Sequence, residues 1–172
     1  VVNNGAITGV WGAAGIANRM EGAISKATNN GEISSSNSEP ASGVVCIILG
    51  ACTFEQCFNY GDVIFEGVSS RNRSTAGGIV GNVYVPKAAT AGAYVRACMN
   101  YGNISAGDGG NKYDSNNRNA IHAAGVVAYM EGREDLRSCV IDCANYGSVN
   151  SKGGRTGNIC GSAVSASAPA SS

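Results

Sequence analysis

A five-residue unit recurs five times in this chain of 172 residues: asparagine, any residue, glycine, any residue, then isoleucine or valine. The copies begin at Asn3, Asn29, Asn59, Asn100 and Asn145, and their glycines are Gly5, Gly31, Gly61, Gly102 and Gly147. Asparagine and glycine favour a turn, because the amide side chain bonds nearby backbone and glycine accepts a positive φ. Since successive glycines are 26, 30, 41 and 45 residues apart, the unit predicts stacked coils with one similar turn per coil.

Two further units recur between these copies. The first is a small residue, a glycine, any residue and then an apolar residue. Its glycines are Gly15, Gly43, Gly78, Gly125 and Gly157. A short apolar segment ends at Ala27, Cys57, Cys98 and Cys143. Because no helical period persists and each coil offers three short extended segments, the chain predicts an all-β fold. We expect a parallel β-solenoid (β-helix) of about five coils over 1–161, right-handed as parallel crossovers usually are, followed by a low-complexity tail or linker over 162–172. A hairpin meander stays possible, but it would not explain a three-part repeat.

Stacking of the coils predicts columns of equivalent residues. Three inward columns are expected, namely Ile7, Ile33, Val63, Ile104 and Val149; Ile16, Val44, Ile79 and Val126; and Val1, Ala27, Cys57, Cys98 and Cys143. The repeated asparagines should form a ladder, as stacked amides do in other repeating β structures. The glycine column predicts a positive φ at Gly102. Glu55 and Arg96 should meet on the outer face, two residues before their cysteines.

Composition narrows the classes of partner. The 12 basic and 12 acidic residues cancel, which argues against a strongly basic nucleic-acid binder. The 44% hydrophobic content argues against wholesale disorder. No apolar stretch approaches the roughly 18 residues of a membrane-spanning helix, and no signal sequence is visible. We therefore expect no nucleic-acid partner and no membrane insertion.

These repeats resemble the GLUG-type repeats of bacterial surface proteins. The segment Gly77-Gly78-Ile79-Val80-Gly81, followed by Cys98-Met99-Asn100-Tyr101-Gly102-Asn103-Ile104, carries the resemblance most closely. The first coil departs from it, with Ala27 and Asn30 where later coils have cysteine and tyrosine. The resemblance implies an exported, extracellular or cell-surface protein of an anaerobic gut-type bacterium, such as an adhesin. It implies no catalytic residues and no cofactor.

Tyr60, Tyr101 and Tyr146 occupy the same turn position in three successive coils and are the candidate binding stripe. Aromatic rows can bind sugars or partner proteins, although the rings could equally pack on one another and cover the turn. Polar insertions of growing length, including 69–75 and 108–119, lengthen one corner of the coil and favour either a binding face or solvated slack. A glycan or a host or bacterial surface protein is the expected partner, besides neighbouring domains of a longer chain.

The seven cysteines leave at least one thiol without an intrachain partner. Recurrence at a packing position favours buried, unpaired thiols at Cys57, Cys98 and Cys143, and Cys46 and Cys160 should share another column. A disulfide involving Cys52 or Cys139 is the alternative. No zinc-type spacing occurs. Asp108, Asn111 and Asp114 are a weak calcium candidate against an ordinary polar loop, and His122, the single histidine, should be a solvated loop residue.

The function predicted from these features is a non-enzymatic repeat module of an exported bacterial surface protein, acting as an adhesin or a spacer. The alternative is a carbohydrate-binding or polysaccharide-cleaving β-helix domain. Cleavage would need two carboxylates flanking a substrate, whereas the acidic residues are scattered and no repeat column is acidic. A structural fragment that serves neighbouring domains is the third possibility.

Overall fold

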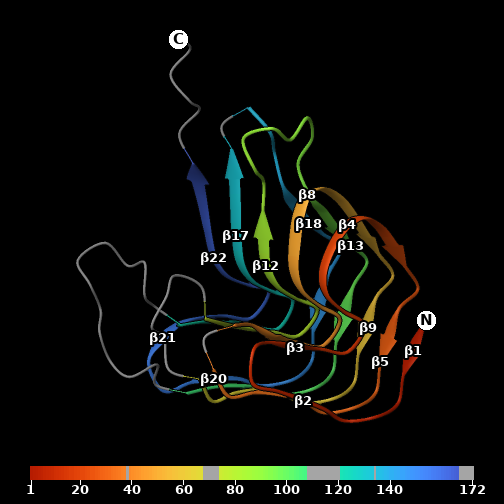
Figure 1. Cartoon of the computed structure of the whole chain (residues 1–172), viewed down its shortest axis with the longest axis vertical. Helices are drawn as coiled ribbons and strands as arrows, with labels where there is room; N and C mark the ends of the chain where they lie inside the picture. Colours follow the sequence, from red (N-terminus) through yellow and green to blue (C-terminus); the bar gives the residue numbers. More distant parts are fainter. Residues whose placement is uncertain (38, 68–73, 108–120, 134, 167–172) are drawn as a thin grey trace.

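The protein is an all-β parallel solenoid in a computed structural model that describes residues 1–37, 39–67, 74–107, 121–133 and 135–166. Equivalent strands of successive coils pair in parallel and in register, and the described residues contain no helix. Figure 1 shows the coils stacked side by side, with the strands of each sheet following one another in colour order. The predicted fold class is therefore confirmed.

Two sheets carry the repeated turn. Sheet A consists of β1 (Val2–Asn3), β5 (Thr28–Asn29), β9 (Phe58–Asn59), β14 (Met99–Asn100) and β19 (Ala144–Asn145). Sheet B consists of β2 (Ile7–Gly9), β6 (Ile33–Ser35), β10 (Val63–Phe65), β15 (Ile104–Ala106) and β20 (Val149–Ser151). The turn between them is the Asn-x-Gly unit, so each sheet gains one strand per repeat.

The other two sheets complete the coil. Sheet C consists of β3 (Ala13–Ala14), β7 (Ala41–Ser42), β11 (Thr75–Gly77), β16 (Ile121–Ala124) and β21 (Gly154–Gly157). Sheet D consists of β4 (Ala17–Ser25), β8 (Val45–Glu55), β12 (Val80–Tyr84), β13 (Tyr94–Arg96), β17 (Val127–Arg133), β18 (Cys139–Ile141) and β22 (Cys160–Ala166). Because β8 pairs with both β12 and β13, one long strand of the early coils is divided in two later. Each of the first coils thus has four strands, one more than the sequence predicts.

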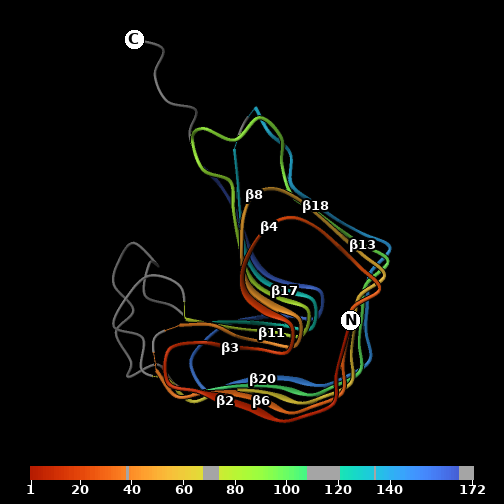
Figure 2. The ribbon, with the colours of Figure 1, turned by 45° about the vertical axis from the view of Figure 1, so that its right-hand side comes forward.

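The coil outline has two lobes, because the chain turns inward between sheets C and D. In Figure 2 the coils nearly superpose, with sheet B along the bottom, sheet C across the middle and sheet D rising from the inward turn. The lower core lies between sheets B and C and contains Ile33, Val63, Phe65, Ile104 and Ile121. The upper core contains Ile48, Phe54, Val83, Val95 and Cys98. All ten side chains are buried.

The register reproduces the predicted columns up to the last coil, where it differs by one residue. Gly157 pairs with Ala124 and Cys160 pairs with Val127. Asn158 therefore occupies the position that Gly15, Gly43, Gly78 and Gly125 hold in earlier coils. The prediction that Cys46 and Cys160 share a column is wrong, because Val45, the residue before Cys46, belongs to the Val127 column.

One expectation about backbone conformation also differs from the structure. The glycine of the repeated turn has no positive φ at Gly102, whereas Lys26, Gln56, Ala97 and Asp142 do, with φ between 51° and 55°. Gly102 is required for another reason: a Cβ there would overlap the carbonyl group of Gly61 in the preceding coil. The turn therefore needs glycine so that neighbouring backbones can approach closely.

The last described strand extends into the expected tail. Strand β22 pairs with β17 as far as Ala166, so 162–166 belong to the solenoid, and residues 167–172 lie outside the described part. Across the described segments we find no helix with the length and apolar character needed to cross a membrane.

Candidate binding surface

The inner side of the repeated turn is an asparagine ladder in which each side-chain amide donates two hydrogen bonds. Asn59 Nδ2 donates to the carbonyl of Gly61 at 2.8 Å and to Asn100 Oδ1 in the next coil at 2.7 Å. Asn3, Asn29 and Asn100 make the same pair of bonds, and Asn145 Nδ2 likewise donates to the carbonyl of Gly147. Since Asn29, Asn59 and Asn100 are fully buried, these side chains are committed to holding the coils together.

Asn158 ends this ladder. Asn145 Nδ2 donates to Asn158 Oδ1 at 2.6 Å, although Asn158 comes from the inward turn between sheets C and D. In earlier coils glycine stands there, because a Cβ at Gly125 would overlap the side chain of Asn145 in the next coil. The Asn158 side chain thus supplies the acceptor that the asparagine of a further coil would supply.

The outer side of the same turn carries the tyrosine stripe, which we define as Tyr60, Tyr101 and Tyr146. Ring centroids are 4.8 Å apart between Tyr60 and Tyr101 and 4.9 Å between Tyr101 and Tyr146, with interplanar angles of 5° and 13°. The residues are 51%, 40% and 66% exposed. The structure thus brings together all three residues that the sequence singles out.

The stacking decides which parts of these rings a ligand can reach. Parallel rings at this spacing cover one another's faces in offset stacking. The ring edges remain exposed along the stripe, while the Tyr101 hydroxyl donates to Met99 Sδ at 3.5 Å. Tyr146 directly follows β19, the last strand of sheet A, and stacks on Tyr101 with one face. A ligand lying along the stripe therefore meets apolar ring edges, and Tyr146 at the end of the stripe offers a flat stacking surface.

A polar row runs beside the stripe, two residues further along each coil. Asp62 Oδ1 accepts hydrogen bonds from the Asn103 backbone N–H at 2.7 Å and from Asn103 Nδ2 at 3.2 Å. Asn103 Oδ1 in turn accepts from Ser148 Oγ at 2.9 Å. Glu32 precedes Ile33 as Asp62 precedes its partner Val63, so two neighbouring members of this row are acidic. Asp62 is engaged as an acceptor and orders the turn.

The cysteine column packs inside sheet A. Cys57 and Cys98 are fully buried, Cys143 is half-buried, and all seven cysteines, including Cys52 and Cys139, are free thiols. Hydrogen bonding by the Cys98 thiol favours the thiolate of its neighbours and lowers the pKa of Cys143, while the pKa of Cys98 itself is raised. Because Cys98 has a single S–H, it can stabilise only one neighbouring thiolate at a time.

Two further predictions concern a calcium site and the single histidine. Asp108, Asn111 and Asp114, the calcium candidate, lie outside the described residues. Within the described part, no three His, Cys, Asp or Glu residues are grouped so as to hold a metal ion. His122 is not a solvated loop residue: it lies in β16, is 4% exposed, and its ring centroid is 5.1 Å from that of Tyr129. Burial, followed by the charge of Arg155, lowers the pKa of His122 to about 4.

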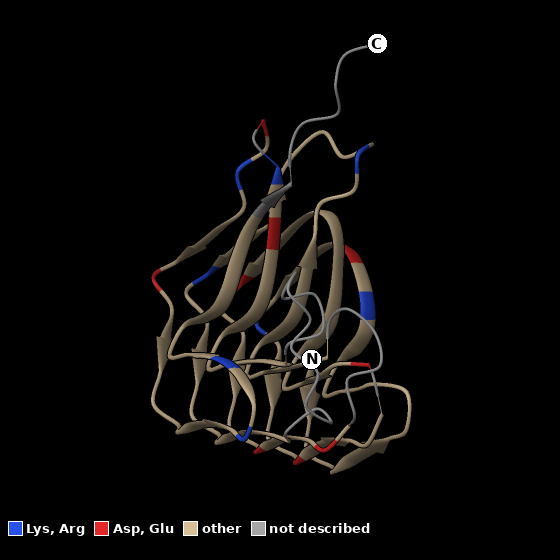
Figure 3. Cartoon of the chain, turned by 90° about the vertical axis from the view of Figure 1, so that its left-hand side faces the viewer, with Lys and Arg blue, Asp and Glu red and all other residues tan. Residues whose placement is uncertain are grey.

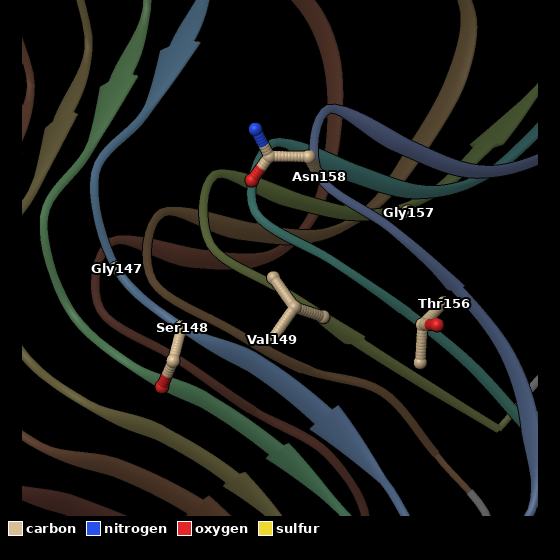
Figure 4. A pocket seen from close by; sticks show the side chains of 6 residues that line it. All are labelled: Gly147, Ser148, Val149, Thr156, Gly157 and Asn158. Atoms are coloured by element: carbon tan, nitrogen blue, oxygen red, sulfur yellow. The ribbon is translucent and has the colours of Figure 1, made fainter.

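A cavity of about 300 Å³ opens at the last coil. Figure 4 shows its lining residues, Gly147, Ser148, Val149, Thr156, Gly157 and Asn158, around the space between β20 and β21. Val149 and Thr156 end the inward columns of Ile104 and Ala123, so the cavity is the open end of the lower core.

Charged residues do not mark out one face of the described chain, because basic and acidic positions are interspersed in Figure 3.

Comparison of the chain with protein-family models, with curated proteins and with solved structures finds no match in any of the three. The resemblance to GLUG-type repeats therefore stays a prediction. The repeated asparagines are buried and hydrogen-bonded between coils, whereas the repeated tyrosines are exposed.

Proposed function

We propose that this chain is a non-enzymatic β-solenoid module of an exported bacterial surface protein, which acts as an adhesin by binding an extended glycan along the tyrosine stripe. The exposure of three stacked tyrosines carries the proposal. The asparagines, turn glycines and column cysteines serve the stacking of coils, whereas the tyrosines present aromatic surface on the outside. The resemblance to surface repeats supports export.

A glycan suits the chemistry of the stripe. Phenol rings combine apolar edges with a hydroxyl that donates and accepts, and sugars likewise alternate C–H and hydroxyl groups. The parallel row with its adjoining polar side chains offers both kinds of contact in a line. Because neighbouring rings fix one another, little side-chain entropy is lost when a ligand binds.

The stack also suits a spacer. Coils joined by register-matched strands and by the asparagine ladder form a stiff body in which each coil contacts its neighbours. A module of this kind would hold the stripe away from the surface that carries it. The binding and spacer roles therefore support each other.

The test compares two tyrosines of equal exposure. Tyr101 and Tyr94 are both 40% exposed, but Tyr94 lies in β13 of sheet D, outside the stripe. The wild-type protein is first screened on an array of polysaccharides, and the best ligand is then titrated by calorimetry. We expect Tyr101→Leu to weaken binding roughly tenfold, as loss of a central aromatic contact does, and Tyr94→Leu to leave it unchanged.

Three outcomes would count against the proposal. Equal affinity of Tyr101→Leu and wild type would remove the stripe from the binding site. Binding to surface proteins but to no glycan would favour the other expected partner. Release of shortened chains from a polysaccharide would favour the cleaving β-helix, and it would be sought with the same ligands.

A further inference from the structure

The inward turn between sheets C and D brings two rows of polar side chains face to face. On sheet C, Thr75 pairs with His122 and His122 pairs with Arg155 in successive coils. On sheet D, Asn82 pairs with Tyr129 and Tyr129 pairs with Ser162. Contacts join the rows: the rings of His122 and Tyr129 lie 5.1 Å apart, and Arg155 Nη1 donates to Ser162 Oγ at 3.2 Å. None of these residues belongs to the tyrosine stripe.

This cluster has more hydrogen-bonding capacity than the protein uses. Thr75 Oγ1 and His122 Nδ1 are buried and have no partner in the described part of the structure. Thr75 is fully buried and His122 is 4% exposed. Buried polar atoms are normally paired, and unpaired ones call for an explanation such as a bound ion. Two of them stand here in one row.

The cluster also carries an unbalanced positive charge. Arg155 is half-buried, and across the described residues its one hydrogen bond is to Ser162 and no carboxylate faces it. His122 feels that charge directly, since Arg155 is a cause of its lowered pKa after burial. Among the described residues, the neighbours of His122 include the charged Arg155 on β21 and the Tyr129 ring on β17, and Glu131 lies two residues beyond Tyr129 on that strand.

We propose that Arg155, His122 and Ser162, with Thr75 in the same row, form a binding site for a tetrahedral oxyanion, such as a sulfate or phosphate group. Guanidinium donates paired N–H groups to such anions. The hydroxyl of Ser162 and an imidazole N–H add donors, and within the described residues no carboxylate is paired with Arg155. The site lies apart from the tyrosine stripe and does not depend on the glycan proposal.

His122 is the single histidine of the chain, so its ring signals in a proton–carbon NMR spectrum report on this site without ambiguity. We titrate pH in sodium sulfate, sodium phosphate and, at matched ionic strength, sodium chloride. Bound oxyanion should favour the imidazolium, so we expect sulfate or phosphate to raise the pKa of His122 saturably by more than about one pH unit above its value in chloride. Glucose 6-sulfate against glucose then tells a free anion from an ester on a sugar.

Variants separate binding from screening. Arg155→Gln removes the charge, and although it also changes the pKa of His122 without ligand, the anion-dependent increase should vanish. Arg96→Gln, in an ion pair with Glu55 on the outer face, is the matched control and should respond as wild type does. If Arg155→Gln fails to fold, as judged by circular dichroism, Arg155→Lys should bind sulfate at least roughly tenfold more weakly, because the guanidinium fork is lost.

The proposal is overturned if chloride and sulfate act alike on wild type, since the effect would then be ionic screening alone. It is equally overturned if Arg155→Gln, or failing that Arg155→Lys, binds sulfate as tightly as wild type. A response to glucose 6-sulfate but not to inorganic sulfate would keep the oxyanion chemistry and assign the ester as the ligand.

Discussion

Asn59 and Tyr60 are adjacent in the chain, yet they belong to opposite sides of the same turn. The Asn59 side chain is fully buried and bonded to both its own coil and the next, whereas Tyr60 is half exposed and touches the next coil by stacking. Both rows repeat with the coil. Repetition alone therefore does not distinguish structural residues from candidate binding residues. The distinction comes from how much of a side chain's hydrogen-bonding capacity and surface is already used within the protein.

The inner row should be the more sensitive to substitution. Asn100→Ala removes the acceptor of Asn59, the donor to Asn145 and the donor to the Gly102 carbonyl. Leaving these buried groups unpaired should cost about 3–5 kcal/mol of unfolding free energy. Asn30→Ala, which breaks only the exposed bond to Asn4, is the control and should cost below about 0.5 kcal/mol. Chemical denaturation gives both values, and equal losses would end the contrast between the two rows.

The glycine of the turn tests whether close approach or φ is what the repeat requires. Gly102→Ala should cost about 2–3 kcal/mol, because the new Cβ meets the backbone of Gly61. Gly107, which likewise has no positive φ, would place a Cβ no closer than 3.5 Å to its neighbours. Gly107→Ala should therefore be nearly neutral in the same denaturation experiment. If both substitutions were tolerated, the coils would be able to separate without loss.

The cysteine column is an inner row held by packing, and it should be tolerant. Cys98→Ala should cost about 1 kcal/mol, because it leaves a small cavity and the column already accepts Ala27. Thiol labelling followed by mass spectrometry should find fewer reactive thiols in the native protein than in the unfolded one. A cross-link of Cys98 to Cys57 or Cys143 in freshly purified protein would instead show a covalent staple in this column.

The smallest effect is expected on the outer face of sheet D. Arg96 Nε lies 3.4 Å from Glu55 Oε1, with both side chains well exposed. Since exposed ion pairs are weak, a double-mutant cycle with Glu55→Gln and Arg96→Gln should give a coupling of about 0.2–1 kcal/mol that falls as salt rises. A larger coupling that persists in salt would mean that this outer row holds the coils together as the inner one does.

The sequence predicts whatever repeats with a recognisable residue type. The asparagine ladder, the apolar columns, the tyrosine stripe and the Glu55–Arg96 contact all follow from alignment of the coils. The positive-φ row does not, because Lys26, Gln56, Ala97 and Asp142 share no side-chain property that indicates this conformation.

Features that depend on irregular coils were harder to predict. The last coil shifts by one residue because Asn158 replaces the expected glycine, and a glycine-based alignment cannot detect this. The cluster around His122 was missed because its members come from three coils and two sheets, and only the inward turn brings them together. A fourth sheet was missed because the strands of sheet A are two residues long, as in Phe58–Asn59, and read as part of the Asn-x-Gly turn.

Asn158 determines where further coils could be added to the solenoid. Identical hydrogen bonds between successive coils do not limit the number of coils, and the open edge of a sheet can pair with a further strand. The Asn158 side chain lies where the ladder asparagine of a directly following coil would lie. Whole coils could therefore be inserted between those of Asn59 and Asn100. Directly after Asn158, the ladder asparagine of an added coil would clash with the Asn158 side chain.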